Sequence, residues 1–240
     1  MEILCGRDYN IKNAANGNRM GEEQIMEKNE ILRRVDHTQL KAYATWEDIV
    51  VLCEEALAFG TASVCVPPAY IGRIHEKYGD KINICTVVGF PLGYSVTEAK
   101  LAETVKAIED GANEIDMVIN ISDVKNGLYQ KVEEEIRTLK KACGDKILKV
   151  IVETCYLTRE EKIAMCRAVT AAGADYIKTS TGFGTGGATL EDVRLFRENI
   201  GPEVKIKAAG GISTLEDLEA FVEAGCDRIG TSRAVGLLRG

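Results

Sequence analysis

One local pattern recurs along the chain: an apolar helix end, a glycine, a small residue, and then a short strand rich in β-branched residues. It occurs around Gly60, Gly111, Gly173 and Gly225. The residues before each glycine have helical periodicity, and the glycine stands where a left-handed helix C-cap is needed. A chain that repeats helix, turn and strand is expected to alternate α and β elements around a parallel sheet.

Eight candidate strands follow from this alternation, at an average spacing of about 28 residues, which accommodates one strand, one helix and two loops. They end near Asp36, Val66, Phe90, Asn120, Thr154, Ser180, Ala209 and Ser232. Amphipathic stretches between them cover residues 97–109, 132–142, 158–171, 190–199 and 214–222. Eight βα units in one domain predict a closed (β/α)8 barrel, the TIM barrel. The alternative is an open doubly wound sheet, which favours a G-x-G-x-x-G motif after an early strand, and no early strand is followed by one.

The repeat also sets the domain boundaries. Residues 1–30 lie outside it and are predicted to form a short N-terminal extension, whereas residues 31–240 form the barrel and catalytic domain. Residues 21–35, which span the end of the extension, can form a helix with Ile25, Leu32 and Val35 on one side. Such a helix is expected to close the bottom of the barrel.

Composition excludes several classes of protein. The chain has 240 residues, a formal net charge of −7 and 45% hydrophobic residues, which is ordinary for a globular protein. Its acidity argues against nucleic-acid binding, and its apolar runs are too short for a membrane helix. The charged N-terminus lacks the apolar core of a secretory signal, so a cytoplasmic location is expected. The sequence is compatible with a homodimer but does not specify the oligomeric state.

The cysteines and histidines indicate neither a disulfide framework nor a metal centre. The eight cysteines are spread along the chain without a C-x-x-C pair, as expected for reduced and mostly buried thiols. The chain has only two histidines, His37 and His75, so a zinc site built on several imidazoles is not available. We therefore expect neither a metal nor an organic cofactor.

Charged residues inside apolar strands are the first candidates for chemistry. Asp116, Lys149, Lys178 and Lys207 each lie within a predicted strand, although a buried ammonium is costly unless it is paired or neutralised. Lys178 and Lys207 are one βα unit apart, so they are expected at similar heights on adjacent strands, facing one cavity. Lys149 is a weaker candidate that pairs with a carboxylate low on its strand. Lys205, at the start of its strand, is expected to extend from the bottom face.

Two neighbouring ammonium groups and apolar walls both lower the pKa of an amine. A neutral amine is a nucleophile that forms a Schiff base with a carbonyl compound. Asp116 can supply the counter-charge and relay a proton to or from Lys178 and Lys207. The alternative for this trio is a structural salt bridge between Asp116 and one lysine.

Two glycine-containing loops predict a phosphate site after the last two strands. Gly210 and Gly211 follow the Lys207 strand, and Gly230, Thr231 and Ser232 end the last one. Barrels of this class bind phosphate at these loops, where glycine lets backbone N–H groups approach the anion. Residues 213–216 fit a capping box that opens the next helix. The alternative is that these are ordinary turn glycines beside an ordinary N-cap.

Other polar residues at strand ends are candidates for substrate contact. Thr181 follows the Lys178 strand, and its hydroxyl is placed to orient a sugar, although residues 179–187 also fit a simple linker. Asp36 and Thr38 end the first strand and are expected either to touch substrate hydroxyls or to cap a helix. His37 between them is expected to pack rather than to catalyse. Cys65 is expected to be a thiol that either packs in the core or faces the cavity. Glu153 is expected to be the partner of a lysine.

These motifs together resemble the deoxyribose-phosphate aldolase family, class I aldolases on a (β/α)8 barrel. The resemblance runs from about residue 36 to residue 232. Its most specific segments are Gly-Ala-Asp-Tyr-Ile-Lys-Thr-Ser-Thr-Gly around Lys178, Lys-Ala-Ala-Gly-Gly-Ile from Lys207, and Glu-Ile-Asp-Met-Val around Asp116. Residues 88–93 and 149–154 also fit. The chain departs from the family's pattern in the extension before residue 30 and in its ending, Leu-Leu-Arg-Gly, which lacks the C-terminal tyrosine that some members use.

The resemblance implies roles for the three strand residues. Lys178 would be the Schiff-base lysine, Lys207 the neighbouring cation that takes part in proton transfer, and Asp116 the proton donor or acceptor. The implied reaction is reversible cleavage of 2-deoxy-D-ribose 5-phosphate to D-glyceraldehyde 3-phosphate and acetaldehyde, without a cofactor. The glycine loops named above match the positions expected to hold the phosphate.

Three other functions remain open from the sequence. Another Schiff-base aldolase or a transaldolase would share Lys178 but use a longer donor than acetaldehyde. A phosphosugar isomerase on the same fold would act by acid–base chemistry, with a glutamate base and a histidine at strand ends. A non-catalytic phosphosugar-binding protein would not require two neighbouring buried lysines.

Overall fold

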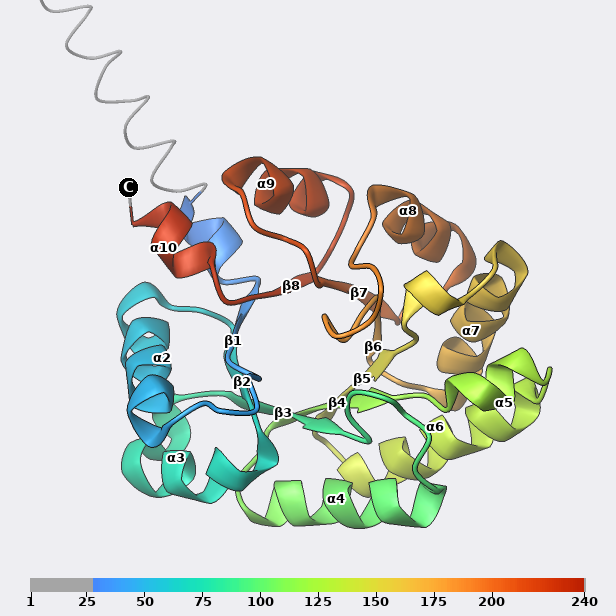
Figure 1. Cartoon of the computed structure of the whole chain (residues 1–240), viewed down its shortest axis with the longest axis horizontal. Helices are drawn as coiled ribbons and strands as arrows, with labels where there is room; N and C mark the ends of the chain where they lie inside the picture. Colours follow the sequence, from blue (N-terminus) through green and yellow to red (C-terminus); the bar gives the residue numbers. More distant parts are fainter. Residues whose placement is uncertain (1–27, 240) are drawn as a thin grey trace, which may run out of the picture.

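The computed structural model describes residues 28–239. Eight strands form one closed parallel barrel in which each strand pairs with its neighbours in sequence, and β1 pairs with β8 to close the ring. The helices surround this ring, as Figure 1 shows in a view down the barrel. The predicted (β/α)8 fold is confirmed, and the open doubly wound sheet is excluded by the closure.

The strands are short, and all but a few of their residues are buried. They are β1 (Val35–Thr38), β2 (Ser63–Val66), β3 (Ile84–Val88), β4 (Glu114–Val118), β5 (Ile147–Ile151), β6 (Tyr176–Lys178), β7 (Lys205–Ala209) and β8 (Arg228–Thr231). Each ends within three residues of the position predicted for it. Because both faces of a parallel strand are covered here, the strands read as almost continuous apolar runs interrupted by a few charges.

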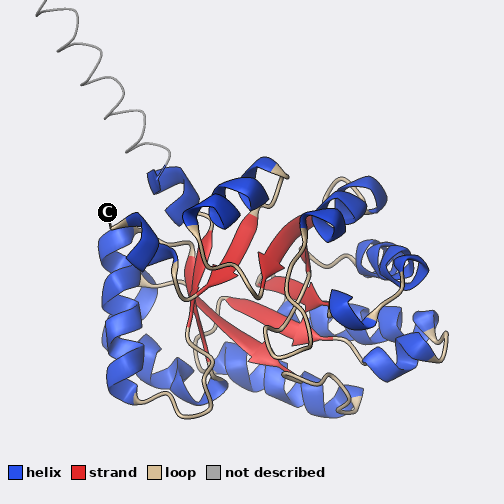
Figure 2. Ribbon diagram, turned by 45° about the horizontal axis from the view of Figure 1, so that its top comes forward, coloured by secondary structure: helices blue, strands red, loops and turns tan. Residues whose placement is uncertain are grey.

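Helices connect consecutive strands and cover the outer face of the barrel (Figure 2). The α-helices are α2 (Trp46–Phe59), α3 (Ile71–Tyr78), α4 (Thr97–Glu109), α5 (Ile121–Lys125), α6 (Tyr129–Cys143), α7 (Arg159–Ala172), α8 (Leu190–Asn199), α9 (Leu215–Glu223) and α10 (Ala234–Leu238). Short 3-10 helices are η1 (Pro68–Tyr70), η2 (Gly79–Lys81) and η3 (Thr154–Tyr156). No helix among residues 28–239 combines the length and hydropathy that a membrane crossing requires.

Helix ends follow the local signals in the sequence. Thr158 caps α7 in a capping box with Glu161, and Gly60 and Gly173 adopt the left-handed conformation at the C-caps of α2 and α7. Gly111 and Gly225 also have positive φ, one residue beyond the cap. The predicted capping box at residues 213–216 is wrong by one residue. Thr214 is the N-cap of α9, with Asp217 as its partner, because the same spacing of hydroxyl and carboxylate recurs one position later.

The N-terminal prediction is only partly testable. Residues 1–27 of the predicted extension lie outside the described residues. Residues 28–32 are helical, but the predicted helix does not continue to Val35, because Val35 begins β1 and pairs with Ile229 of β8. The apolar residues that suggested one helix face therefore lie in two elements. Leu32 is buried at the end of the helix, and Val35 is buried in the first strand.

Strand register brings the charged strand residues together. Lys178 of β6 is the register partner of Lys207 of β7, so the two lysines have the same height, as predicted from their spacing. Asp116 of β4 is the register partner of Lys149 of β5. Since side chains alternate between the two faces of a strand, these residues point into the barrel while their neighbours pack against the helices.

Candidate active site

A cavity of about 500 Å³ opens at the carboxyl ends of the strands. It is lined from four directions: residues 38–41 after β1, Lys178 with residues 181–183 of β6 and its loop, residues 209–213 of β7 and its loop, and residues 230–233 of β8 and its loop. Lys41, Lys178 and Arg233 bring cationic groups to this lining, and among the described residues no carboxylate belongs to it. The cavity is therefore suited to an anionic ligand.

The floor of the cavity contains the three predicted catalytic residues in direct contact. Oδ2 of Asp116 lies 2.6 Å from Nζ of Lys178 and 2.6 Å from Nζ of Lys207. Asp116 and Lys207 are fully buried, and Lys178 is 3% exposed and is the member that borders the cavity. One carboxylate therefore bridges two amines, within the distance at which a proton can pass between them.

Below this floor, further charges fill the barrel. Nζ of Lys149 lies 2.9 Å from Oδ1 of Asp116 and 2.5 Å from Oε2 of Glu114, which confirms the expected carboxylate partner of Lys149. Arg228 at the start of β8 pairs with Glu114 at 3.0 Å and with Asp36 at 2.5 Å. The barrel interior is thus a connected network rather than a set of isolated pairs.

The network keeps its deeper members ionised. Burial alone would raise the pKa of Asp116, but the cations of Lys149, Lys178 and Lys207 hold it well below its usual range. Burial alone would lower the pKa of Lys207, but Asp116 and Asp36 together raise it above its usual value. Lys207 is therefore held as a cation, because two carboxylates outweigh the repulsion from the neighbouring amines.

Lys178 differs from the other cations in its number of acidic partners. Lys207 contacts both Asp116 and Asp36, and Lys149 and Arg228 each contact at least two carboxylates. Among the described residues, Lys178 pairs with Asp116 alone. The carboxylates of the network are Asp36, Glu114 and Asp116, and its cations are Lys149, Lys178, Lys207 and Arg228. The cations outnumber the carboxylates by one, so one positive charge has no matching carboxylate. Lys178 is thus the one amine of this network that borders the cavity, and it has the fewest acidic partners.

The predicted phosphate residues form one wall of the cavity. Gly210, Gly211, Gly230, Thr231 and Ser232 all line it. Gly210 and Gly211 have φ of 84° and 79°, a conformation that residues with a Cβ rarely adopt. The Thr231 hydroxyl donates to the Ile212 carbonyl at 3.0 Å and accepts from the Arg233 N–H at 3.1 Å, so it ties the two loops together.

The remaining predicted contacts divide into two groups. Thr38 and Thr181 line the cavity. Asp36 does not, because its fully buried carboxylate is directed at Lys207, Arg228 and the hydroxyl of Ser63, which donates to it at 2.7 Å.

The two residues that were expected to pack or to assist a lysine also have clear positions. His37 is buried and lies 2.8 Å from Glu55 on α2, in agreement with a packing role. The expectation that Glu153 partners a lysine is wrong, because both of its carboxylate oxygens accept hydrogen bonds from Thr181.

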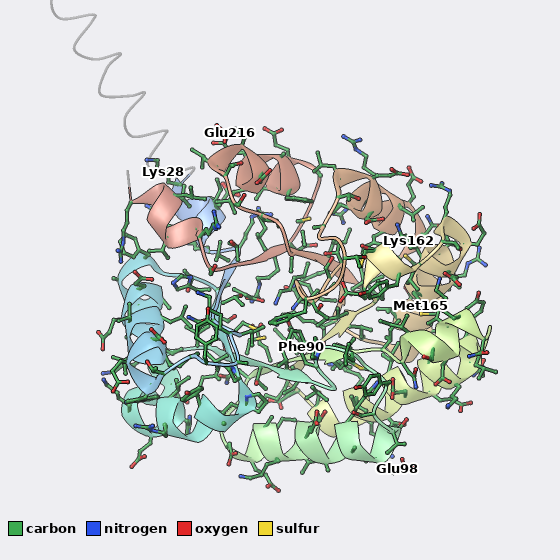
Figure 3. The ribbon with its side chains drawn as sticks, in the orientation of Figure 1. Lys28, Phe90, Glu98, Lys162, Met165 and Glu216 are labelled. Carbon is green, nitrogen blue, oxygen red and sulfur yellow. The ribbon has the colours of Figure 1, made fainter. Side chains whose placement is uncertain are left out.

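An apolar and thiol-containing region completes the interior on the side of β2 and β3. Cys65 and Cys85 are register partners and pack with Val87, Leu40 and Phe90. Figure 3 shows Phe90 toward the middle of the ring, whereas Glu98 lies on the outer rim with α4. The thiols and Asp116 lie close enough to one another to ligate a metal ion, but the ammonium of Lys149, 3.3 Å from Cys85 Sγ, already occupies this region with positive charge.

Several site residues were not identified from the sequence. Glu114 and Arg228 complete the network from the first positions of their strands, and Lys41, Ser213 and Arg233 line the cavity. Alternation along the strands could have predicted part of this, because residues two positions apart on a strand face the same side. Glu114 precedes Asp116 by two positions, and Arg228 precedes Gly230 by two. Lys205 stands in the same relation to Lys207, but it is exposed at the start of β7, with Nζ 5.7 Å from the Tyr176 ring, as expected for a residue at the bottom face.

Comparison with known families decides the relationship. Residues 30–240 match the family model described as DeoC/LacD family aldolase. The chain belongs to this family. Among curated relatives of this aldolase, the deoxyribose-phosphate aldolase of Clostridium botulinum strain Alaska E43 is 73% identical over 215 residues, which cover 90% of this chain and 97% of the relative. The deoxyribose-phosphate aldolase of Clostridioides difficile strain 630 is 58% identical over 209 residues, or 87% of this chain and 95% of the relative.

Solved structures agree with the aldolase fold. A putative deoxyribose-phosphate aldolase from Coccidioides immitis is similar with a TM-score of 0.85 and 41% identity, covering 88% of this chain and 85% of that one. The deoxyribose phosphate aldolase from Aeropyrum pernix, described as having a unique tetrameric structure, has a TM-score of 0.81 and 32% identity, covering 92% of this chain and 94% of that one.

Proposed function

We propose that this aldolase reversibly cleaves 2-deoxy-D-ribose 5-phosphate to D-glyceraldehyde 3-phosphate and acetaldehyde through a Schiff base on Lys178. The observation that carries the proposal is the position of Lys178: it borders an electropositive cavity and shares its single carboxylate, Asp116, with a second buried lysine. The high identity to relatives named deoxyribose-phosphate aldolase supports the choice of substrate.

The first chemical step forms the covalent bond. The neutral amine of Lys178 adds to the C1 aldehyde of the open-chain sugar, and loss of water gives an iminium ion, which is an electron sink. Asp116 lies at hydrogen-bond distance from Lys178 and Lys207, so it is the group through which the proton of Lys178 leaves. Lys207 stays charged and opposes a second positive charge beside it.

The second step breaks the sugar. Removal of the C3 hydroxyl proton, with Asp116, Lys207 and a water as the proton relay, lets the C2–C3 bond break, and its electron pair moves toward the iminium nitrogen. The products are glyceraldehyde 3-phosphate and an enamine on Lys178. Protonation of the enamine at C2 and hydrolysis then release acetaldehyde and regenerate the amine. Neither a metal nor an organic cofactor takes part in these steps.

The phosphate group is bound at the wall formed by Gly210, Gly211, Gly230, Thr231 and Ser232. Backbone N–H groups of these loops and the cations of Lys41 and Arg233 supply the attraction. Thr38 and Thr181 are placed to meet sugar hydroxyls on the other sides of the cavity, whereas Asp36 acts through Lys207.

The competing functions make different demands on the site. An isomerase requires a histidine at a strand end facing the substrate. Both histidines lie within the described residues, and neither lines the cavity. Another Schiff-base aldolase or a transaldolase would use Lys178 with a hydroxylated donor, so donor preference separates these enzymes from the proposed one.

The test is product formation from 2-deoxy-D-ribose 5-phosphate, with acetaldehyde and glyceraldehyde 3-phosphate each measured by a coupled dehydrogenase. We expect both products in equal amounts, no product from Lys178→Met, and full activity from Lys205→Met, a matched change at an exposed lysine outside the cavity. Preferential reaction of fructose 6-phosphate would instead assign another Schiff-base aldolase if the sugar is cleaved alone, or a transaldolase if its three-carbon unit is transferred to an added acceptor aldehyde. Full activity of Lys178→Met would refute the covalent mechanism.

We also propose that the aldolase is a cytoplasmic homodimer. Leu92, Tyr94 and Val96, in the segment between β3 and α4, are 55%, 68% and 66% exposed, which favours an interface there. The described cysteines are free thiols, as is usual in a reducing compartment. Light scattering during gel filtration tests the dimer, and a Tyr94→Glu change is expected to shift it toward the monomer.

A further inference from the structure

A buried carboxylate without a cation lies beside the cavity. Glu153 follows β5 and is 1% exposed, and no ion pair with it is found among residues 28–239. It is also the one non-glycine residue in that range with positive φ, at 55°. A buried charge and a left-handed backbone are both unfavourable, and such residues persist where the surrounding structure needs them.

The shortest hydrogen bonds of Glu153 come from the loop that carries Thr181, and the Cys155 thiol lies 3.9 Å from its Oε1. The N–H of Thr181 is 3.2 Å from each carboxylate oxygen, and the hydroxyl of Thr181 donates to Oε2. Just before this point, backbone pairing continues from β5 to β6, with the Val152 N–H donating to the Lys178 carbonyl and the Thr154 N–H to the Thr179 carbonyl. The Glu153 side chain therefore takes over where backbone pairing ends, three residues beyond Lys178.

The same loop packs against the phosphate wall. The Ala188 N–H donates to the Gly210 carbonyl at 3.0 Å. A Cβ on Gly187 would lie 2.2 Å from that carbonyl oxygen, and a Cβ on Gly184 would lie 3.1 Å from the Glu153 carboxyl carbon. The segment 181–188 thus fits closely between Glu153 on one side and the Gly210 loop on the other.

A third contact orients the tip of the loop. The Phe183 N–H donates to the Thr181 hydroxyl oxygen at 3.0 Å, and the Phe183 ring packs edge-on against Phe90 at 5.3 Å between centroids. Because the Thr181 hydroxyl donates to Glu153, its lone pair is free to accept from Phe183. Glu153 therefore sets the position of Thr181 and, through it, the position of the loop residues that line the cavity.

We propose that Glu153 is a positioning residue that makes the aldolase selective for phosphorylated sugars. This inference rests on the proposed function. Glu153 holds the 181–188 segment in the place where it supports the Gly210 loop, and the phosphate meets a preformed wall. Without the carboxylate, the wall must be ordered by the phosphate itself. That cost falls on the phosphorylated substrate alone, in addition to the loss of the Thr181 contact that both substrates share. Lys178 lies in β6, which is held by pairing with β5 and β7, so its position and its reaction with the aldehyde do not depend on Glu153.

The test compares two substrates that differ in the phosphate. For Glu153→Ala we expect kcat/KM for 2-deoxy-D-ribose 5-phosphate to fall about 10- to 100-fold, mostly through KM, as for other residues that orient a ligand-binding group. The kcat/KM for unphosphorylated 2-deoxy-D-ribose, which loses only the Thr181 contact, should fall by a clearly smaller factor, and competitive inhibition by inorganic phosphate should weaken with the first substrate. Glu153→Gln retains one oxygen that can accept from the Thr181 N–H and should recover part of the loss.

A matched control separates positioning from general damage. Glu135 is also a buried carboxylate, but it pairs with Lys100 between α6 and α4, away from the cavity. Glu135→Gln is expected to lower stability without changing the ratio of the two kcat/KM values. Equal losses on both substrates in Glu153→Ala, carried by kcat, would contradict the proposal, and so would unchanged selectivity.

Hydrogen exchange keeps this inference separate from the proposed function. In wild-type protein, the amides of residues 181–188 should exchange slowly and become slower still with inorganic phosphate. In Glu153→Ala they should exchange faster, with the slowing by phosphate restored only at higher concentration. If wild-type protein cleaves neither sugar, the proposed function fails, but the exchange result still decides the role of Glu153. Identical exchange in both proteins would contradict that role.

Discussion

The two lysines of the cavity floor have neighbouring positions and different surroundings. Lys207 on β7 is fully buried between Asp116 and Asp36, in the closed part of the charge network. Lys178 on β6 has the same height, but it has one carboxylate partner and borders the cavity. Under the proposed function, the same side chain serves as a fixed cation in one place and as a nucleophile in the other. The difference is made by the number of neighbouring carboxylates and by access to the cavity.

The largest expected difference between these two regions is in stability. Lys207→Met removes a fully buried cation that contacts both Asp36 and Asp116, and it should lower the free energy of unfolding by about 3 kcal/mol, the lower end of the cost of breaking a buried ion pair. Lys178→Met removes the surplus positive charge, and Asp116 keeps Lys149 and Lys207, so the loss should be about 1 kcal/mol or less. Urea unfolding of both variants measures this, and equal losses would break the comparison.

The closed network also predicts how stability depends on pH. The pKa values of Asp36 and Asp116 are held below 3.8, the usual value of an aspartate, so their contribution is complete above that value and is lost as the pH falls below it. The pKa of Lys207 is raised above 10.5, so its contribution is complete below that value and is lost only at still more alkaline pH. Stability should therefore have a plateau between about pH 5 and pH 10, with an acid limb of up to roughly 1.4 kcal/mol per pH unit for each group.

Asp36→Asn provides the check on this pH dependence. Urea unfolding between pH 3 and pH 7 should show a shallower acid limb in this variant than in the wild-type protein, because one of the two groups no longer titrates. An unchanged slope would mean that Asp36 has an ordinary pKa and does not form a strong ion pair with Lys207.

A smaller effect is expected from a cation of the cavity wall. Arg233 lines the cavity and is exposed, and no ion pair with it is found in the described part of the chain. Arg233→Ala should raise KM for the phosphorylated sugar about tenfold, equivalent to about 1.4 kcal/mol, with kcat almost unchanged. The stability should remain the same, in contrast to Lys207→Met. Steady-state kinetics and unfolding of the same preparation test both statements.

The fold and the central trio could be predicted because their signals are local or periodic. Glycine-terminated helices mark four of the βα units, and the spacing of Lys178 and Lys207 by one unit indicates their common height on adjacent strands. The closed network could not be predicted in full, because Arg228 and Glu114 meet across the barrel from strands far apart in the sequence. Alternation along a strand shows that a residue faces inward, but it does not show which inward residues touch.

The same limit applies to the charges around Lys207 and to Glu153. The sequence shows the lysine beside Lys207 but not the two carboxylates that approach from β4 and β1 and raise its pKa. Glu153 was expected beside a lysine because of its place at a strand end, but its left-handed backbone directs the carboxylate to Thr181. Each depends on tertiary geometry rather than on sequence pattern.

The most direct test of the central claim is reductive trapping. The protein is incubated with acetaldehyde and borohydride, and the modified residue is mapped by mass spectrometry. We expect an ethyl group on Lys178 and none on Lys207, because Lys178 borders the cavity whereas Lys207 is fully buried between two carboxylates. Modification of Lys207 instead, or of neither lysine in the folded protein, would contradict the assignment of a nucleophile and a fixed cation to these two positions.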